Sequence, residues 1–398
     1  MLYPRWLETS RRHTLLPAVY DGDQVFTFGD LATAVEHAPV ATSPVIARAG
    51  GAVFIVEILR AWRDGQAVIP VERDAPEPSL QRPPPDDCRL VKYTPGAAGI
   101  PRGIFFNDAQ VIADCDRIVA AMKLSPSIPN LAVISLSHSY GFSNVVLPLI
   151  LHGVPMHLAP VPFPRPIEDI FKQHEAMVVP AVPSMWRAWH RAGILKGAPI
   201  SLAISAGASL AASLEADVFA DAHLKIHNFY GASESGGISF DDSDIPRESA
   251  DDVGMVLDGV SVRAGSDGRL LVNSSSVAMG YDESRDGDSL ENGNYLTRDH
   301  GNLTADGRLH LTGNCGGAIN VAGRKVSPAK VEAALLATGC VTSARVFGTP
   351  SSDPERCEEI CAKVSLAQGK TLDDLKAAAM ERLQNWELPR HWQSVSGH

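Results

Sequence analysis

Short apolar runs alternate with amphipathic stretches between about residues 88 and 240, and this alternation constrains the fold more than any other feature of the chain. Four runs are interpreted as buried strands, at 131–136, 176–179, 201–205 and 224–229. Helices are predicted between them, near 163–173, 184–193 and 209–222. Residues 44–72 repeat the order strand, helix, strand. Such alternation indicates a parallel sheet covered by helices on both faces, so we expect an α/β fold.

The pattern changes after residue 250. Three segments alternate with Asp-Gly turns, as antiparallel hairpins do, and predict a β-rich subdomain: 260–263, 268–273 and 307–312. Beyond Gly317 a small α+β unit is expected, with a strand near 319, a helix over 328–337, strands near 341–348 and 358–366, and a helix over 371–385. The Gly-rich stretch Gly313–Gly317 separates the two parts. We therefore predict an N-terminal domain over 1–313, a hinge over 314–317 and a C-terminal domain over 318–398.

Composition excludes several classes of protein. Hydrophobic residues make up 45% of the chain and charged residues 20%, as in soluble globular proteins. The formal net charge of −11 argues against a broad nucleic-acid interface, which needs clustered Lys and Arg. No apolar run approaches the roughly 18 residues that cross a bilayer, and the start of the chain lacks the layout of a signal peptide. We expect a cytoplasmic protein without a membrane span, whose cysteines are reduced and lack zinc-ligand spacing.

The segment Tyr93–Gly103 is a Gly-rich turn followed by a cation, Arg102. Bare backbone N–H groups in such a turn can approach a polyphosphate closely, and the cation can neutralise its charge. The segment is not a Walker A loop, because the Gly-Lys-Ser/Thr ending is absent. Taken alone, it could equally be an ordinary surface loop.

The segment Asn228–Ser235 directly follows a predicted strand. In a doubly wound sheet the carboxyl ends of the strands face the ligand crevice. There Tyr230 could stack on a base, Ser233 could donate to a phosphate oxygen, and Glu234 could hold a hard metal ion. The alternative is a turn with one solvated carboxylate.

A third segment, Gly293–Gly301, contains Asp299. A carboxylate in this position could accept hydrogen bonds from both hydroxyls of a ribose. Taken alone, it could also be an ordinary turn aspartate.

In this order, the three segments resemble the superfamily of adenylate-forming ligases: acyl-CoA synthetases, aryl acid ligases and peptide-synthetase adenylation domains. The resemblance runs from about Val19 to Pro389. Residues 94–103 resemble the family's phosphate loop, and Tyr230-Gly-Ala-Ser-Glu234 resembles its Tyr-Gly-x-Thr-Glu motif. Further similar segments are His138–Gly141 (aromatic acyl-site motif), Ser205–Ala208 (Ser-Gly-Gly-Ala), Thr297–Asp299 (Thr-Gly-Asp) and Gly313–Pro328 (the joint).

The resemblance implies that the protein uses ATP and Mg²⁺ to convert a small carboxylic acid into an acyl-adenylate. The acyl group would then pass to the thiol of CoA or of a carrier-protein phosphopantetheine, with rotation of the C-terminal unit between the two steps. It implies catalytic roles for Glu234 (also the metal ligand), Lys325 and Arg102. The implied nucleotide-binding residues are Thr94, Gly96, Ala97, Ala98, Gly99, Gly207, Tyr230, Gly231, Ser233 and Asp299. The implied acid-binding residues are His138, Tyr140, Gly141, Ala206, Gly207 and Gly231.

The sequence departs from the family pattern in three places. Pro95, Ala97 and Ala98 stand where the family offers hydroxyls, which removes hydrogen bonds to phosphate. Asn314 replaces the usual arginine of the joint, and Gly316 the usual hinge residue. The sequence stops at His398, before the family's C-terminal lysine. We therefore expect either a sequence that is cut short or slow adenylation.

Two further interpretations belong to other classes. A non-catalytic relative that binds an acyl group or a nucleotide is favoured by these departures, whereas the retained Glu234 and Asp299 favour the enzyme. A nicotinamide dehydrogenase is excluded, since no Gly-x-Gly-x-x-Gly occurs at a strand–helix turn. The small residues around His138 and Tyr140 suit a flat aryl acid at least as well as a long flexible chain, and we take an aryl acid such as hydroxybenzoate as the expected substrate. The compact N-terminal part also resembles ligases of pigment and aryl-polyene pathways, which load carrier proteins.

Overall fold

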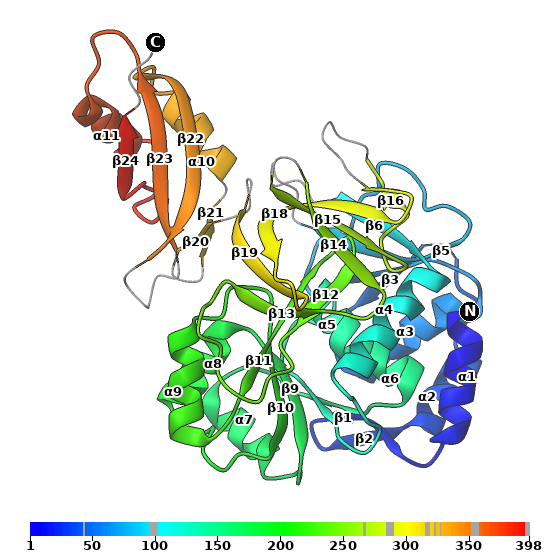
Figure 1. Ribbon diagram of the computed structural model, residues 1–398. Helices are drawn as coiled ribbons and strands as arrows, with labels where there is room; N and C mark the ends of the chain where they lie inside the picture. The colour runs from blue at the N-terminus through cyan, green and yellow to red at the C-terminus, as the bar shows by residue number, and fades with distance from the viewer. Residues whose placement is uncertain are drawn as a thin grey trace. The chain divides into compact units, whose positions relative to one another are not determined.

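The computed structural model describes residues 1–42, 44–94, 102–265, 268–283, 290–314, 319–321, 324–326, 328–351 and 358–394. By their contacts the residues fall into two units. Unit 1 contains most of residues 1–311, and unit 2 contains the chain from Thr312 onward together with Arg298–His300. Both units combine helices with strands, which confirms the predicted α/β class (Figure 1). The predicted hinge lies outside the described residues, apart from Asn314.

The centre of unit 1 is a parallel sheet with the strand order β8, β7, β9, β10, β11. In that order the strands are Met156–Leu158, Asn130–Ala132, Met177–Ala181, Ile200–Ser205 and Ile226–Ala232. The helices packed on this sheet are α4 (Asp108–Ala121), α7 (Pro164–Phe171), α8 (Pro183–Arg191) and α9 (Ala212–Ala222).

Helices cover both faces of this sheet. Val179 of β9 belongs to a core cluster with Trp186 of α8, whereas its neighbour Val178 belongs to a second cluster with Ile118 of α4. Successive side chains of a strand point to opposite faces, so α8 and α4 must lie on different sides. Figure 1 shows α7, α8 and α9 together on the side away from α4. The predicted parallel sheet with two covered faces is confirmed.

The strand predicted over 131–136 was too long, because β7 ends at Ala132. The residues that follow are mostly buried, which explains their apolar pattern, but their backbone leaves the sheet and enters a helical segment. This segment consists of α5 (Ser139–Gly141), the π-helical stretch η1 (Phe142–Val146) and α6 (Leu147–His152). Short π-helical turns inside helices frequently occur at functional sites.

The first part of unit 1, joined by the later strand β16, supplies a second sheet, ordered β16, β6, β5, β4, β3. Residues 44–72 form β3 (Val45–Arg48), α3 (Gly51–Arg63) and β4 (Val68–Val71), with the two strands parallel, as predicted. The other strands are β5 (Cys88–Thr94), β6 (Arg102–Asn107) and β16 (Gly280–Tyr281). The preceding elements are α1 (Leu2–Arg12), β1 (Pro17–Asp21), β2 (Gln24–Thr27) and α2 (Phe28–His37).

Beyond β11 the large sheet continues with mainly antiparallel strands, in the order β12, β13, β19, β18, β15, β14. They are Gly236–Phe240, Asp252–Val256, Arg308–Asn314, Asn294–Leu303, Arg269–Ser274 and Val260–Ala264, and β17 (Leu290–Glu291) pairs with β18. Strands β14 and β15 pair antiparallel, so the hairpin predicted after residue 250 is confirmed.

A buried ion network ties α9 to the start of β11 and the end of β12. Glu215 of α9 accepts hydrogen bonds from Lys225 and from Arg247, whose Nε lies 2.8 Å from Glu215 Oε2. Lys225 also donates to Asp241, which accepts a further bond from Arg308 at 3.0 Å. Glu215 and Asp241 are fully buried, so each depends on these cations for compensation of its charge.

Unit 2 has its own core around a three-stranded sheet, ordered β22, β23, β24. Its elements are β20 (Ile319–Val321), β21 (Arg324–Val326), α10 (Pro328–Leu336), β22 (Val341–Pro350), β23 (Glu358–Leu366), α11 (Leu372–Met380) and β24 (His391–Ser394). The predicted strands and helices are present, but the helix predicted over 371–385 ends at Met380.

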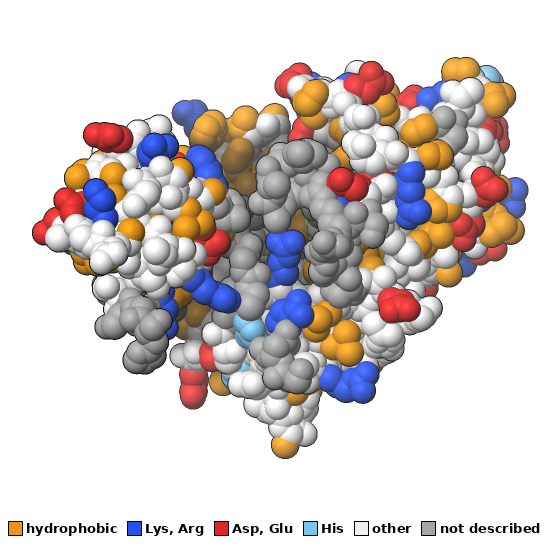
Figure 2. Space-filling model, turned by 90° about the horizontal axis from the view of Figure 1, so that it is seen from above, with side chains coloured by type: hydrophobic (Ala, Val, Ile, Leu, Met, Phe, Trp, Pro, Cys, Tyr) orange, Lys and Arg blue, Asp and Glu red, His pale blue; other side chains and the backbone are white. Residues whose placement is uncertain are grey.

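No helix among the described residues is both long and apolar enough to cross a membrane. On the face seen from above, acidic and basic side chains are interspersed with apolar ones among the residues drawn in colour (Figure 2).

His157 of β8 and His174 form a pair that should make folding depend on pH. His157 Nδ1 lies 2.7 Å from His174 Nε2, and this hydrogen bond needs at least one neutral ring. Burial, then the charge of His174, lowers the pKa of His157 from 6.5 to about 4. The folded state therefore binds the proton more weakly than the unfolded state, so stability is lost as the pH falls from 6.5 towards 4. Since one pH unit is worth about 1.4 kcal/mol, we expect a loss of about 3 kcal/mol.

Denaturant unfolding at pH 7 and at successive values down to pH 4 measures this loss. In the variant His157→Gln the same pH change should lower the free energy of unfolding less, because the suppressed titration is gone. An identical pH dependence in both proteins would contradict the prediction.

Candidate active site

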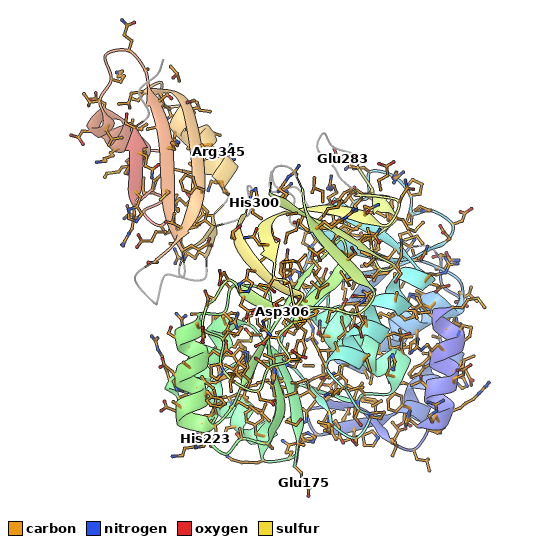
Figure 3. All side chains as sticks on the ribbon, in the orientation of Figure 1. Glu175, His223, Glu283, His300, Asp306 and Arg345 are labelled. Atoms are coloured by element: carbon orange, nitrogen blue, oxygen red, sulfur yellow. The ribbon has the colours of Figure 1, made fainter. Side chains whose placement is uncertain are left out.

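Three parallel strands of unit 1 end at the same edge of the sheet. Ser205 at the end of β10 lies opposite Ala181 of β9 and Asn228 of β11. Glu175, just before β9, lies at the opposite end of unit 1 from Glu283 (Figure 3). The carboxyl ends of parallel strands are where open α/β sheets bind ligands.

Strand β11 turns back into the antiparallel β12 at this edge, and the turn carries Glu234. Ala232 pairs with Gly236, so the loop between the two strands consists of residues 233–235. Gly236 has φ +74°, a left-handed conformation that glycine adopts without strain. A Cβ atom at Gly231 would overlap the Gly236 carbonyl, so this position also requires glycine. Gly231 and Gly236 are therefore required by the backbone conformation of this turn.

Two segments distant in sequence, one around Ser139 and one over 278–281, hold the turn. The backbone N–H of Ala278 donates to the Glu234 carbonyl at 2.8 Å. The Ser139 hydroxyl lies 2.9 Å from the Ser233 hydroxyl. The hydroxyl of Tyr281 donates to Glu234 Oε1 at 3.2 Å. The Glu234 side chain is half-buried, so the carboxylate is oriented by protein contacts and still reaches solvent.

Arg102, predicted to face phosphate, is connected to Glu234 through Tyr281. Its guanidinium carbon lies 3.3 Å from the centroid of the Tyr281 ring, a close cation–π contact. Its Nη1 also donates to the Glu283 carbonyl at 3.4 Å. One aromatic side chain thus orients both the predicted cation and the predicted metal carboxylate. The sequence offered no hint of this role for Tyr281.

Tyr140, predicted to line the acid pocket, points towards the carboxyl ends of the strands. Its hydroxyl reaches the carbonyls of Ile204 at 3.3 Å and Ala181 at 3.5 Å, and its ring centroid lies 6.3 Å from that of Phe229. Burial raises the pKa of the Tyr140 hydroxyl well above its ordinary value. The hydroxyl is therefore neutral at physiological pH and acts as a hydrogen-bond donor to the backbone.

The other predicted acid-binding residues lie near these strand ends. The side chain of His138 is 63% exposed, with Nε2 3.9 Å from Glu72 Oε1, so it is not a packed histidine. Gly141 has no room for a side chain, because a Cβ would overlap the Ser135 carbonyl. Ala206, directly after β10, is buried, and Gly207 follows it with φ +79°.

Several predicted residues cannot be assigned to this arrangement. Gly96, Ala97, Ala98 and Gly99 lie outside the described residues, although Thr94 and Arg102, on either side, pair in register. Asp299 lies within strand β18 and not in a turn, and it groups with unit 2. Lys325 is placed by its backbone on β21 of unit 2. Their roles remain predictions. Tyr230, on β11, packs partly against the core of the antiparallel strands.

A buried polar cluster next to the turn was also not predicted from the sequence. It consists of Lys92 on β5, Asp114 on α4 and Ser143 on η1. Burial lowers the pKa of Lys92, against the opposing effects of the Asp114 and Glu234 carboxylates. Two sequence signals could have revealed the cluster. Lys92 interrupts an apolar strand, and Asp114 lies on the apolar stripe of its helix, one turn after Val111.

The side chains at the turn supply some, but not all, of the ligands that one hard cation needs. Among the described residues, no group of three or more His, Cys, Asp or Glu side chains could hold a metal ion. The carboxylate of Glu234, with the hydroxyls of Ser233 and Ser139 nearby, supplies oxygen ligands only. Oxygen ligands suit Mg²⁺, which typically takes one or two carboxylates and completes its shell with water and substrate phosphates.

The fold and this site define an α/β protein whose Glu234 turn lies at the carboxyl edge of a parallel sheet. The chain belongs to the AMP-binding enzyme family, whose model matches residues 8–282. This result confirms the resemblance to the adenylate-forming superfamily.

Individual relatives are distant. The sulfoacetate–CoA ligase of Cupriavidus necator is 24% identical over 82% of this chain and 67% of its own length. A feruloyl-CoA synthase of Amycolatopsis is 25% identical over 77% of this chain and 65% of its own length. The chain thus spans about two thirds of the length of these curated relatives.

Solved structures share the fold. The amide bond synthetase from Marinactinospora thermotolerans gives a TM-score of 0.73 at 20% identity, covering 100% of this chain and 96% of that one. The o-succinylbenzoate CoA synthetase from Bacillus subtilis gives 0.73 at 16% identity, covering 99% and 94%.

Proposed function

We propose that the protein is an ATP-dependent acid–thiol ligase that activates a carboxylic acid as its acyl-adenylate. The observation that carries this proposal is the hairpin turn bearing Glu234 at the carboxyl edge of the parallel sheet, with Tyr281 joining it to Arg102. Membership of the AMP-binding family supports the same reaction. ATP and CoA, or a carrier-protein phosphopantetheine, would be the cosubstrates.

The chemistry needs positioning and charge compensation more than covalent catalysis. In the first step the acid's carboxylate oxygen forms a bond to the α-phosphorus, and the bond to the β-phosphate oxygen breaks as pyrophosphate leaves. In the second step the thiol sulfur bonds to the acyl carbon, and AMP leaves as the thiol loses its proton. Glu234 would hold Mg²⁺, which supplies charge stabilisation at the phosphates, and Arg102 would add a fixed positive charge. Asp299 and Lys325 are proposed to contact the ribose and a phosphate.

An aryl acid such as a hydroxybenzoate is the proposed substrate class. The rings of Tyr140 and Phe229 lie beside the strand ends, and Ala206, Gly207 and Gly231 add little bulk there. A flat ring can pack against such aromatic neighbours in offset or edge-to-face geometry. Transfer to a carrier protein, as in pigment pathways, is the proposed alternative to CoA as acceptor.

A pyrophosphate-release screen tests the function. The protein is incubated with ATP, Mg²⁺ and one acid at a time: benzoate, hydroxybenzoates, ferulate, sulfoacetate and straight-chain acids. We expect acid-dependent release that is fastest with a hydroxylated benzoate. Faster release with sulfoacetate or a fatty acid would overturn the aryl preference alone. If ATP binds but no acid gives release, the protein is a non-catalytic nucleotide-binding relative.

A further inference from the structure

Asp114 lies directly behind the turn that carries Glu234. Its carboxylate, 3% exposed, accepts a hydrogen bond from the Gly237 backbone N–H at Oδ1 (2.9 Å). At Oδ2 it accepts a bond from the Ser143 hydroxyl (2.7 Å), and Lys92 Nζ lies 4.0 Å from the same oxygen. Lys92 also lies 3.2 Å from the Ser143 hydroxyl. Both oxygens of Asp114 are therefore engaged, and only one of them contacts the turn.

The glycines of the hairpin leave the space that this carboxylate occupies. A Cβ atom at Gly236 would overlap Asp114 Oδ1, and the left-handed φ of Gly236 excludes most other residues independently. Because Gly236 has no side chain, the backbone of the turn lies directly against the Asp114 carboxylate. A shift of Asp114 would be transmitted to Gly236 and Gly237 without an intervening flexible group.

Helix α4 is also linked to the same turn indirectly, through Ser276. Arg117, three residues after Asp114, donates from Nη1 to the Ser276 hydroxyl at 2.8 Å. Ser276 in turn donates to the Ser235 carbonyl at 2.6 Å. One helical turn of α4 therefore holds the residue immediately after Glu234 through Ser276, and the start of β12 through Asp114.

We propose that Asp114 is a positioning residue that sets the direction of the Glu234 carboxylate by anchoring the hairpin turn at Gly237. This inference rests on the proposed function, in which Glu234 holds the divalent ion. Metal ligands must keep their geometry within a fraction of an ångström, and groups that orient them affect affinity strongly. Lys92 and Ser143 orient the Asp114 carboxylate. Its Oδ1 atom holds the turn by accepting the hydrogen bond from the Gly237 N–H.

Two double variants isolate that acceptor atom. Lys92→Met/Asp114→Asn keeps an amide oxygen for Gly237 and an N–H₂ for Ser143, whereas Lys92→Met/Asp114→Leu has neither. Both variants remove the two buried charges together, so neither leaves an unpaired ion in the core. They have the same charge and the same number of side-chain heavy atoms at position 114, although leucine is the bulkier residue. Asp241→Asn, at the far end of β12, is a control for general destabilisation.

The first measurement is the Mg²⁺ concentration that gives half-maximal pyrophosphate release, together with the KM for the acid. With Lys92→Met/Asp114→Leu we expect the Mg²⁺ requirement to rise about 10-fold and the KM for the acid to stay within about twofold. With Lys92→Met/Asp114→Asn and with Asp241→Asn the Mg²⁺ requirement should stay within about threefold of the parent. Equal Mg²⁺ requirements in the Leu and Asn double variants would overturn the proposal.

A binding measurement separates this inference from the proposed function. Mn²⁺ is titrated calorimetrically into each protein saturated with a non-hydrolysable ATP analogue, and thermal unfolding verifies the fold. Weaker Mn²⁺ binding by the Leu double variant than by the Asn one supports the role of Asp114, even if no acid gives turnover. Equal binding in a folded, active pair refutes it. If the Leu double variant does not fold, Asp114→Ser is compared with the Asn double variant instead. A serine side chain at position 114 is too short to reach Gly237.

Discussion

Glu234→Gln is expected to lower acid-dependent pyrophosphate release by about 10²–10³-fold, with little change in thermal stability. The amide has almost the same shape and can still accept the hydrogen bond from the Tyr281 hydroxyl. It lacks the negative charge that a divalent cation beside a triphosphate requires. Single-turnover formation of AMP and pyrophosphate from acid plus ATP measures the effect directly.

Two variants accompany that measurement. Tyr281→Phe retains the ring under Arg102 and removes only the hydroxyl, so a much smaller loss of rate is expected. Glu291→Gln, an exposed glutamate on β17 of the same unit, serves as the matched control for loss of one surface charge. A Glu234→Gln protein that releases pyrophosphate at a near-normal rate would remove Glu234 from the active site.

Glu215→Ala is expected to lower the free energy of unfolding by about 3–5 kcal/mol. Glu215 is the shared partner of Lys225 and Arg247, and all three side chains are buried. Truncating the carboxylate leaves two cations in the interior, with Asp241 to compensate only Lys225. Equilibrium denaturation in urea gives the change in unfolding free energy.

Glu168→Ala provides the comparison for this stability measurement. Glu168 lies 3.8 Å from Lys172 across one turn of α7, and both side chains are about half-exposed or more. Such a pair contributes at most about 0.5 kcal/mol. A Glu215→Ala protein as stable as Glu168→Ala would show that Lys225 and Arg247 find other compensation.

The sequence predicted the parallel sheet well, because strands buried on both faces form uniform apolar runs. Val178 and Val179 face different cores and are both apolar for that reason. The same signal misled the prediction after Ala132, where residues are buried without belonging to the sheet. Apolar composition reports burial, and only indirectly the backbone path.

At the site, the residues of one contiguous motif could be predicted and their partners could not. Glu234 was singled out because it directly follows a predicted strand and because the contiguous residues Tyr230–Glu234 resemble a family motif. Tyr281 lies 47 positions away and Asp114 contacts a residue 123 positions away. A single sequence carries no information on which distant segments meet, so such partners become visible only in the folded chain.

The π-helical stretch Phe142–Val146 changes the relative direction of the side chains before and after it in the same helical segment. In a regular α-helix each residue advances the direction of the side chain by about 100°, and a π-turn inserts roughly one extra residue into the cycle. The segment before it sends Tyr140 towards Ile204, and the segment after it sends Leu149 into the core formed with the N-terminal helices. The extra residue works as a phase shift between these two directions. In a regular α-helix nine steps of about 100° would turn Leu149 to about 180° from Tyr140, and the extra residue removes about one of these steps and so changes the angle between the two side chains.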